Sequence, residues 1–154
     1  RENVRIALQR KLGVSYQFWR PLRILNQLNE KAQATLEQVG LGKFADVEAI
    51  ELPYGQKRAL EIATTIALEP RLMLLDEPTQ GMSAEDVSTV TDLIKRVVEG
   101  RTIVMVEHNL NVVSTLADQI TVLSRGEILA EGNYDEVSNN PEVMEAYMGT
   151  TDAA

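Results

Sequence analysis

Two adjacent acids, Asp76 and Glu77, directly follow a short apolar run, Leu72 to Leu75. Neighbouring carboxylates repel each other unless a cation or a substrate uses them. Mg²⁺ is the natural candidate, because it is held by one or two carboxylates and completed by water and substrate phosphates. One carboxylate would hold the metal, and the other would act as a general base on an attacking water in phosphoryl transfer. The alternative is that the pair only begins a polar loop or caps a helix.

The one histidine, His108, also follows an apolar run, Thr102 to Val106. A lone histidine after a strand is more often a structural hydrogen-bonding group than a catalytic one. A position beside the two carboxylates would favour the second role, because a neutral imidazole can contact a terminal phosphate or the attacking water.

A third candidate is a stretch before a predicted helix, which consists of Leu52, Pro53, Tyr54, Gly55 and Gln56. Glycine at a helix start allows close approach of the backbone, and the N–H groups and the helix dipole there attract anions. The stretch is therefore a candidate phosphate-binding site, and the alternative is that it only forms a turn.

Helices and strands must bring these candidates together. Apolar residues at three- and four-residue steps predict helices between Pro21 and Gly40 and from about Gly55 to Leu68. The runs at 72–75 and 102–106 predict strands, and the first is typical of a strand buried on both faces.

The segment between the two strands predicts a helix. Ser83 and Asp86 resemble a capping box at its start, and Gly100 ends it. Strand, helix and strand in about 30 residues form a βαβ unit, whose strands are parallel. Since ligands bind outside the carboxyl ends of such strands, we expect Asp76, Glu77 and His108 to share one edge of the sheet.

The remaining chain predicts a helix at about 110–117, a hairpin around residues 124–127 and two short helices. Asn133 with Glu136 would cap the first of the two, and Pro141 suits the opening turn of the second.

Composition narrows the class of protein. The 154 residues include no cysteine, so they hold neither disulfides nor thiolate metal sites. Their apolar runs are only a few residues long, against the roughly 20 that a membrane-spanning helix needs. Residues 1–60 carry 10 basic and 6 acidic side chains, whereas residues 61–154 carry 5 and 17. Because the chain is acidic overall, we expect no nucleic-acid partner.

The first 23 residues are the basic exception, with Phe18 and Trp19 among arginines such as Arg20. Such a segment suits a membrane face, a protein partner or a nucleic acid. A solvated helix face with a few buried aromatic side chains is the alternative.

Taken together, these motifs resemble those of ABC-type ATPases. Residues 52–58, LPYGQKR, resemble the LSGGQ signature, and the strand ending at Asp76 and Glu77 resembles a Walker B strand. Residues 79–83 look like the D-loop, and His108 falls where the switch histidine belongs. The resemblance covers essentially the whole chain. It is strongest to the ATP-binding subunits of importers for branched-chain amino acids and similar amides, although lipopolysaccharide-export ATPases look similar.

The resemblance implies an α/β fold. An α-helical subdomain (residues 1–70) would precede the C-terminal half of a P-loop NTPase, RecA-like core (residues 71–154) with parallel strands. ATP and Mg²⁺ would be the cofactors. Asp76 would hold Mg²⁺, Glu77 would be the catalytic base and His108 would contact the γ-phosphate region. Residues 52–56, with Gly81 and Ser83 of the D-loop, would close over ATP held by a second subunit.

Three departures from the family pattern stand out. The chain contains no G-x-x-x-x-G-K-[ST] loop and no Q-loop, so it resembles the C-terminal part of a longer protein. Pro53 replaces the usual signature serine and lacks both its hydroxyl and a backbone N–H. Ser83 stands where many relatives have aspartate. We therefore expect the intact protein, and not these 154 residues alone, to hydrolyse ATP.

The resemblance also implies partners. We expect a second ATP-binding subunit, in a homo- or heterodimer, and a permease contacted by the basic, aromatic start of the chain. A periplasmic or extracellular binding protein would take part indirectly. The subunit would lie at the cytoplasmic face of the plasma membrane. The alternatives are a non-transport ABC ATPase that acts on DNA or ribosomes and a catalytically inactive interaction module. Because an absent first half would cover part of the sheet, we also expect exposed apolar surface and self-association.

Overall fold

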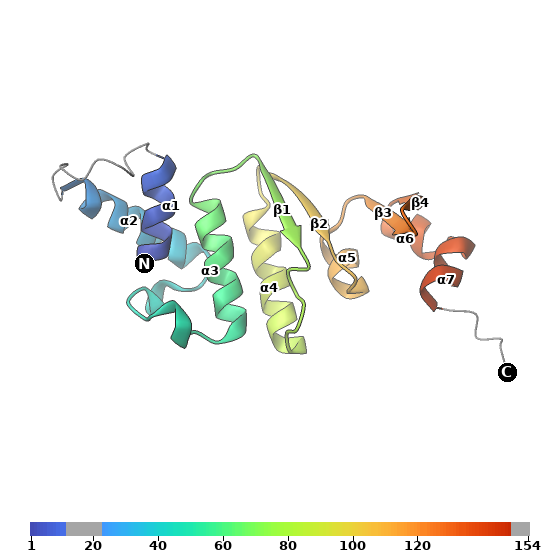
Figure 1. Ribbon diagram of the computed structural model, residues 1–154, viewed down its shortest axis with the longest axis horizontal. Helices are drawn as coiled ribbons and strands as arrows, with labels where there is room; N and C mark the ends of the chain where they lie inside the picture. Colours follow the sequence, from blue (N-terminus) through green and yellow to red (C-terminus); the bar gives the residue numbers. More distant parts are fainter. Residues whose placement is uncertain (12–22, 149–154) are drawn as a thin grey trace. The chain divides into compact units, whose positions relative to one another are not determined.

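The computed structural model describes residues 1–11 and 23–148 and contains two compact units (Figure 1). The first unit comprises residues 1–106 and the second residues 107–154. Within the described ranges, no helix is long and apolar enough to cross a membrane. The predicted boundary at residue 70 separates an α-helical subdomain from the ATPase core by the roles of their motifs. The division into compact units does not test it, so it stays a prediction.

The first unit begins with packed helices. Helix α1 (Glu2–Lys11) contacts α2 (Arg23–Gln38) and α3 (Tyr54–Ile66), and two short 3-10 helices, η1 (Gly42–Phe44) and η2 (Ala49–Glu51), lie between α2 and α3 in the chain. Both long helices predicted from the apolar spacing are confirmed. Helix α2 ends where Gly40 adopts a positive φ of 76°, a conformation that glycine takes without strain.

A βαβ unit follows, as predicted. Strand β1 (Leu72–Asp76) pairs in parallel with β2 (Thr102–Val106). Helix α4 (Ala84–Val97) connects the two strands. The register runs from Leu72 opposite Thr102 to Asp76 opposite Val106, so the two strands end level with each other. The carboxyl end of this pair is therefore the edge at which Asp76 and Glu77 emerge.

The prediction that the first strand is buried on both faces is wrong. In β1, Met73 is 2% exposed, whereas Leu74 is 73% exposed. Side chains alternate between faces along a strand, and on the face of Leu74 the paired strand also exposes Val104 and Val106. When just one face of a sheet is covered, every second side chain of a strand is buried and the others stay exposed. The expected exposed apolar surface is confirmed on this face.

Helix α4 begins at the predicted cap. The Ser83 hydroxyl oxygen accepts a hydrogen bond from the backbone N–H of Asp86 at 3.2 Å and donates one to the Asp86 carboxylate at 2.9 Å. This carboxylate lies against the start of α3, with which α4 packs. A Cβ atom at Gly55 would come within 2.7 Å of Asp86 Oδ1. Glycine at position 55 therefore permits the close approach of α3 and α4.

The second unit contains the predicted hairpin and its flanking helices. Helix α5 (Leu110–Leu116) precedes the antiparallel strands β3 (Ile120–Ser124) and β4 (Glu127–Gly132), and helices α6 (Tyr134–Ser138) and α7 (Pro141–Met148) follow. Asn133 and Glu136 form the predicted capping box on α6. A small core joins the hairpin to both later helices through Val122, Val137 and Val143.

The alternation of buried and exposed side chains along β1 generates a prediction for two adjacent residues, Met73 and Leu74. We expect Met73→Ala to lower the free energy of unfolding by about 3 kcal/mol, because it removes a buried side chain and leaves a cavity. Leu74→Ala is the matched control and is expected to cost less than about 1 kcal/mol, since this side chain is already in water. Urea denaturation of the chain measures both. Equal costs for the two variants would contradict this assignment of faces.

The contact between Gly55 and Asp86 generates a second prediction. Gly55→Ala should lower the free energy of unfolding by about 1 to 2 kcal/mol, because the new methyl group displaces a carboxylate that Ser83 holds. In an Asp86→Ala background the same change should be neutral or stabilising, since alanine favours helix. Urea denaturation of all four members of this double-mutant cycle measures the coupling. A cost independent of Asp86 would show that the methyl group meets another obstacle.

Candidate functional site

The two acids lie on a sharp turn at the carboxyl end of β1. Asp76 is the last residue of the strand, and Glu77 has a positive φ of 42°. A residue other than glycine in this left-handed region costs about 1 kcal/mol, so the surrounding structure must hold it. The backbone N–H of Glu77 donates to the Val106 carbonyl at 2.9 Å, and Pro78 and Thr79 behind it are buried. The turn is therefore fixed against β2 on one side and the protein interior on the other.

A third attachment of the turn comes from helix α3. The Arg58 guanidinium donates from Nη2 to the carbonyls of Asp76, at 3.1 Å, and Glu77, at 3.0 Å. Its Nε donates to the Pro78 carbonyl at 3.1 Å, and its Nη1 contacts the Glu61 carboxylate at 2.6 Å. Sequence reasoning included Arg58 in the signature-like stretch but gave it no role of its own. One side chain thus joins the helix behind that stretch to three consecutive carbonyls of the acidic turn.

The signature-like residues surround the start of α3. Leu52 is buried, Tyr54 is exposed, and Pro53 is the N-cap residue but gives the helix no side-chain cap hydrogen bond. The first N–H groups of a helix have no partner within the helix, and they attract anions. The Gln56 Oε1 atom is buried and has no hydrogen-bond partner among the described residues. This helix start therefore retains polar groups that a bound ligand can satisfy.

The two D-loop candidates have different local settings. Gly81 has a positive φ of 74°, and a Cβ atom built on it would meet nothing within 4 Å beyond Gly81 and its two chain neighbours. Backbone conformation, and not crowding, therefore favours glycine there. Ser83 is the N-cap of α4, so its hydroxyl already has a structural use within the chain. Roles for either residue toward a nucleotide stay predictions.

His108 belongs to the second unit, where it precedes α5. Its imidazole is 65% exposed, and its Nδ1 lies 3.8 Å from Oε2 of Glu107, whose side chain is 1% exposed. The same carboxylate oxygen accepts the backbone N–H of His108 at 3.0 Å. Sequence reasoning did not assign a role to Glu107. The spacing of apolar residues does not distinguish a buried carboxylate at this position from an exposed acid in a loop. The prediction that His108 shares an edge with Asp76 and Glu77 concerns both units and stays a prediction.

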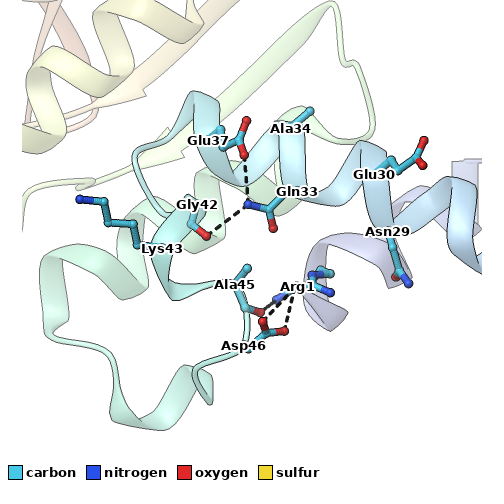
Figure 2. A pocket seen from close by; sticks show the side chains of 10 residues that line it. All are labelled: Arg1, Asn29, Glu30, Gln33, Ala34, Glu37, Gly42, Lys43, Ala45 and Asp46. Atoms are coloured by element: carbon cyan, nitrogen blue, oxygen red, sulfur yellow. Dashed lines mark hydrogen bonds and ion pairs between the residues drawn. The ribbon is translucent and has the colours of Figure 1, made fainter.

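A hollow of about 620 Å³ lies elsewhere in the first unit, between α2 and the segment that follows it (Figure 2). Positively and negatively charged side chains line it, including Arg1, whose Nη2 lies 2.8 Å from Oδ1 of Asp46. Gln33 donates there to the Glu37 carboxylate and to the Gly42 carbonyl. None of the residues predicted to handle ATP or Mg²⁺ lines it.

The acidic turn fits Mg²⁺ together with a phosphate substrate better than it fits a metal alone. Among the described residues, no group of three or more histidine, cysteine or acidic side chains could hold a metal. Two successive carboxylates at a strand end match the donor set of Mg²⁺, which takes one or two carboxylates and completes its shell with water and phosphate oxygens. Asp76 and Glu77 can therefore supply the protein share of such a site.

Comparison with known proteins identifies the family. Residues 1–80 match the ABC transporter family, and residues 127–153 match the family described as branched-chain amino acid ATP-binding cassette transporter.

Curated relatives agree with these matches. The chain is 34% identical, over 96% of its length, to the high-affinity branched-chain amino acid transport ATP-binding protein BraF of Pseudomonas aeruginosa. It is 35% identical, over 82% of its length, to the corresponding protein LivG of Salmonella typhimurium. The chain spans 61% of the length of BraF and 51% of that of LivG.

Solved structures show the same fold. The ATP-binding cassette MJ1267 of an ABC transporter aligns with 96% of this chain and 62% of its own, with a TM-score of 0.76 and 26% identity. The protein cbiO1 of Clostridium perfringens, part of the ABC transporter complex cbiONQ, aligns with 88% of this chain and 53% of its own, with a TM-score of 0.69 and 27% identity. The predicted α/β fold, a partial P-loop NTPase core, is thereby confirmed. With a family match over residues 1–80 and a relative 34% identical over nearly its full length, the chain belongs to the ABC transporter family.

Proposed function

We propose that the chain is part of the ATP-binding and ATP-hydrolysing subunit of an ABC transporter that imports branched-chain amino acids or related amides. The names of BraF and LivG support the substrate class, as does the branched-chain amino acid family match at residues 127–153. A non-transport ATPase is not favoured, because these curated relatives are transport subunits.

The observation that carries the proposal is the arrangement of the acidic turn. Two successive carboxylates emerge where parallel strands end, which is the edge where α/β sheets bind ligands. Through Arg58, the same turn is bonded to the helix that begins with the signature-like residues. Asp76, Glu77 and the signature-like residues 52–56 thus belong to one connected part of the first unit.

The residues divide the chemistry between them. Asp76 would hold Mg²⁺, which supplies charge neutralisation on the phosphates when bound. Glu77 would accept a proton from the attacking water, at its carboxylate oxygen, and orient that water for in-line attack. His108 would donate a hydrogen bond to the γ-phosphate region. Residues 52–56, with Gly81 and Ser83, would face ATP held by a second subunit, so that hydrolysis depends on closure of a dimer.

The partners follow from this function. We propose a homo- or heterodimer of ATP-binding subunits attached to a permease at the cytoplasmic face of the plasma membrane, with an external binding protein acting indirectly. The expected permease contact at Phe18, Trp19 and Arg20 lies outside the described residues. The 154 residues contain no G-x-x-x-x-G-K-[ST] loop, so we propose that they do not hydrolyse ATP by themselves.

The base assigned to Glu77 is testable in the intact protein. Glu77→Gln should lower kcat for ATP hydrolysis by at least about 100-fold, because the amide cannot accept the proton, while the Kd for ATP stays within about threefold. Phosphate release and equilibrium ATP binding measure the two quantities. Uptake of radiolabelled leucine by cells that carry the variant should fall with the ATPase rate.

Glu85→Gln is the matched control, because it makes the same chemical change at an exposed acid on the first turn of α4. It should leave kcat within about twofold of the wild-type value. Full ATPase activity in Glu77→Gln would refute the assigned base. An intact wild-type protein that binds its permease without hydrolysing ATP would favour the inactive interaction module.

A further inference from the structure

We propose that Arg58 is a positioning residue for the catalytic carboxylates, which fixes the backbone of the acidic turn without touching the nucleotide. The inference rests on the proposed function for its catalytic consequence. Its structural part, the attachment of the turn to α3, stands on the hydrogen bonds alone.

The contacts of Arg58 are of an unusual kind. Arg58 pairs with the Glu61 carboxylate through Nη1, as a surface arginine commonly does. In addition, its Nε and Nη2 donate to the backbone carbonyls of three successive residues, Asp76, Glu77 and Pro78. Its side chain is 29% exposed, so these charge-assisted bonds are partly shielded from water. The planar guanidinium presents its donors in a fixed fork, so three carbonyls can bond to it together only in one arrangement of the turn.

This arrangement matters because Glu77 has a left-handed backbone. Its φ of 42° sets the direction in which the Cα–Cβ bond leaves the turn and therefore where the carboxylate can reach. The Glu77 carbonyl accepts from Arg58 and from the backbone N–H of Gln80, while its own N–H donates to Val106. Without Arg58, one of these attachments is lost at the residue that most needs to be held.

The position of Arg58 on α3 adds a functional consequence. The residue lies one turn after Pro53 and Tyr54, at which the helix begins. A shift of this helix start on nucleotide binding would be transmitted to the carbonyls of the acidic turn through the hydrogen bonds of the Arg58 guanidinium. Arg58 thereby couples occupancy of the signature-like segment to the placement of the base.

The test compares variants of the full-length subunit. Arg58→Met keeps an unbranched apolar stem and removes the donors of the guanidinium, and Arg58→Lys retains a charged donor without the fork. Glu61→Gln is the matched control, because it removes the ion pair of Arg58 and leaves the three carbonyl contacts. Steady-state kinetics give kcat and KM for ATP, and hydrogen exchange follows the backbone amides of Gln80 and Met82, which bond within the turn.

We expect Arg58→Met to lower kcat about 10-fold or more with KM and the Kd for ATP within about threefold, because the base is misplaced while binding is retained. Arg58→Lys should recover part of the loss, and Glu61→Gln should stay within about twofold of wild type. Exchange at Gln80 and Met82 should quicken in Arg58→Met while amides in α6 are unchanged.

A kcat within twofold of wild type in Arg58→Met overturns the proposal, and so does a loss of kcat with unchanged exchange in the turn. If kcat falls, KM rises and the melting temperature falls to a matching extent, Arg58 has only a structural role. That outcome also overturns the proposal. If Arg58→Met does not fold, Arg58→Lys decides by the same criteria. Should the wild-type subunit fail to hydrolyse ATP, the proposed function falls, whereas the exchange measurement still decides whether Arg58 holds the turn.

Discussion

The site depends on how the strand end is held. A polypeptide leaving a parallel strand reaches the ligand-binding edge only by turning sharply, and here the turn places Glu77 in a left-handed conformation. A hydrogen bond donated by Glu77 to β2 and one accepted from Arg58 stabilise this conformation, and the buried Pro78 closes the turn behind it. The two carboxylates consequently leave a fixed backbone and not a mobile loop. Preorganisation of this kind is what catalysis by positioning requires.

Local signals in the sequence were sufficient for the order of the elements. The Ser83 and Asn133 caps, the glycine that ends α2 and the proline that opens α7 each act within a few residues of themselves. The parallel pairing also followed from the chain alone, since a helical crossover of this length allows little else. The position of Asp76 at a strand end was therefore predictable before any contact was known.

Contacts between distant residues were beyond such signals. The strand pattern at residues 72–75 is apolar throughout, so it did not distinguish a sheet covered on both faces from one that exposes Leu72 and Leu74. Arg58 reaches a turn about 20 residues away, and nothing in its own neighbourhood marks the three carbonyls it contacts. The Glu107 side chain is likewise buried by residues that its neighbours in the sequence do not identify. Resemblance to a family provided the roles of the acids, and the geometry added how they are held.

A structure of the intact protein with an ATP analogue and Mg²⁺ would show directly which side chains meet the phosphates. We expect the Glu77 carboxylate and the His108 imidazole both to approach the γ-phosphate, within about 3 Å or through one water, with Asp76 on the metal side. A structure in which His108 lies on the far side of the nucleotide, or in which the carboxylates of Asp76 and Glu77 face away from the phosphates, would contradict this expectation.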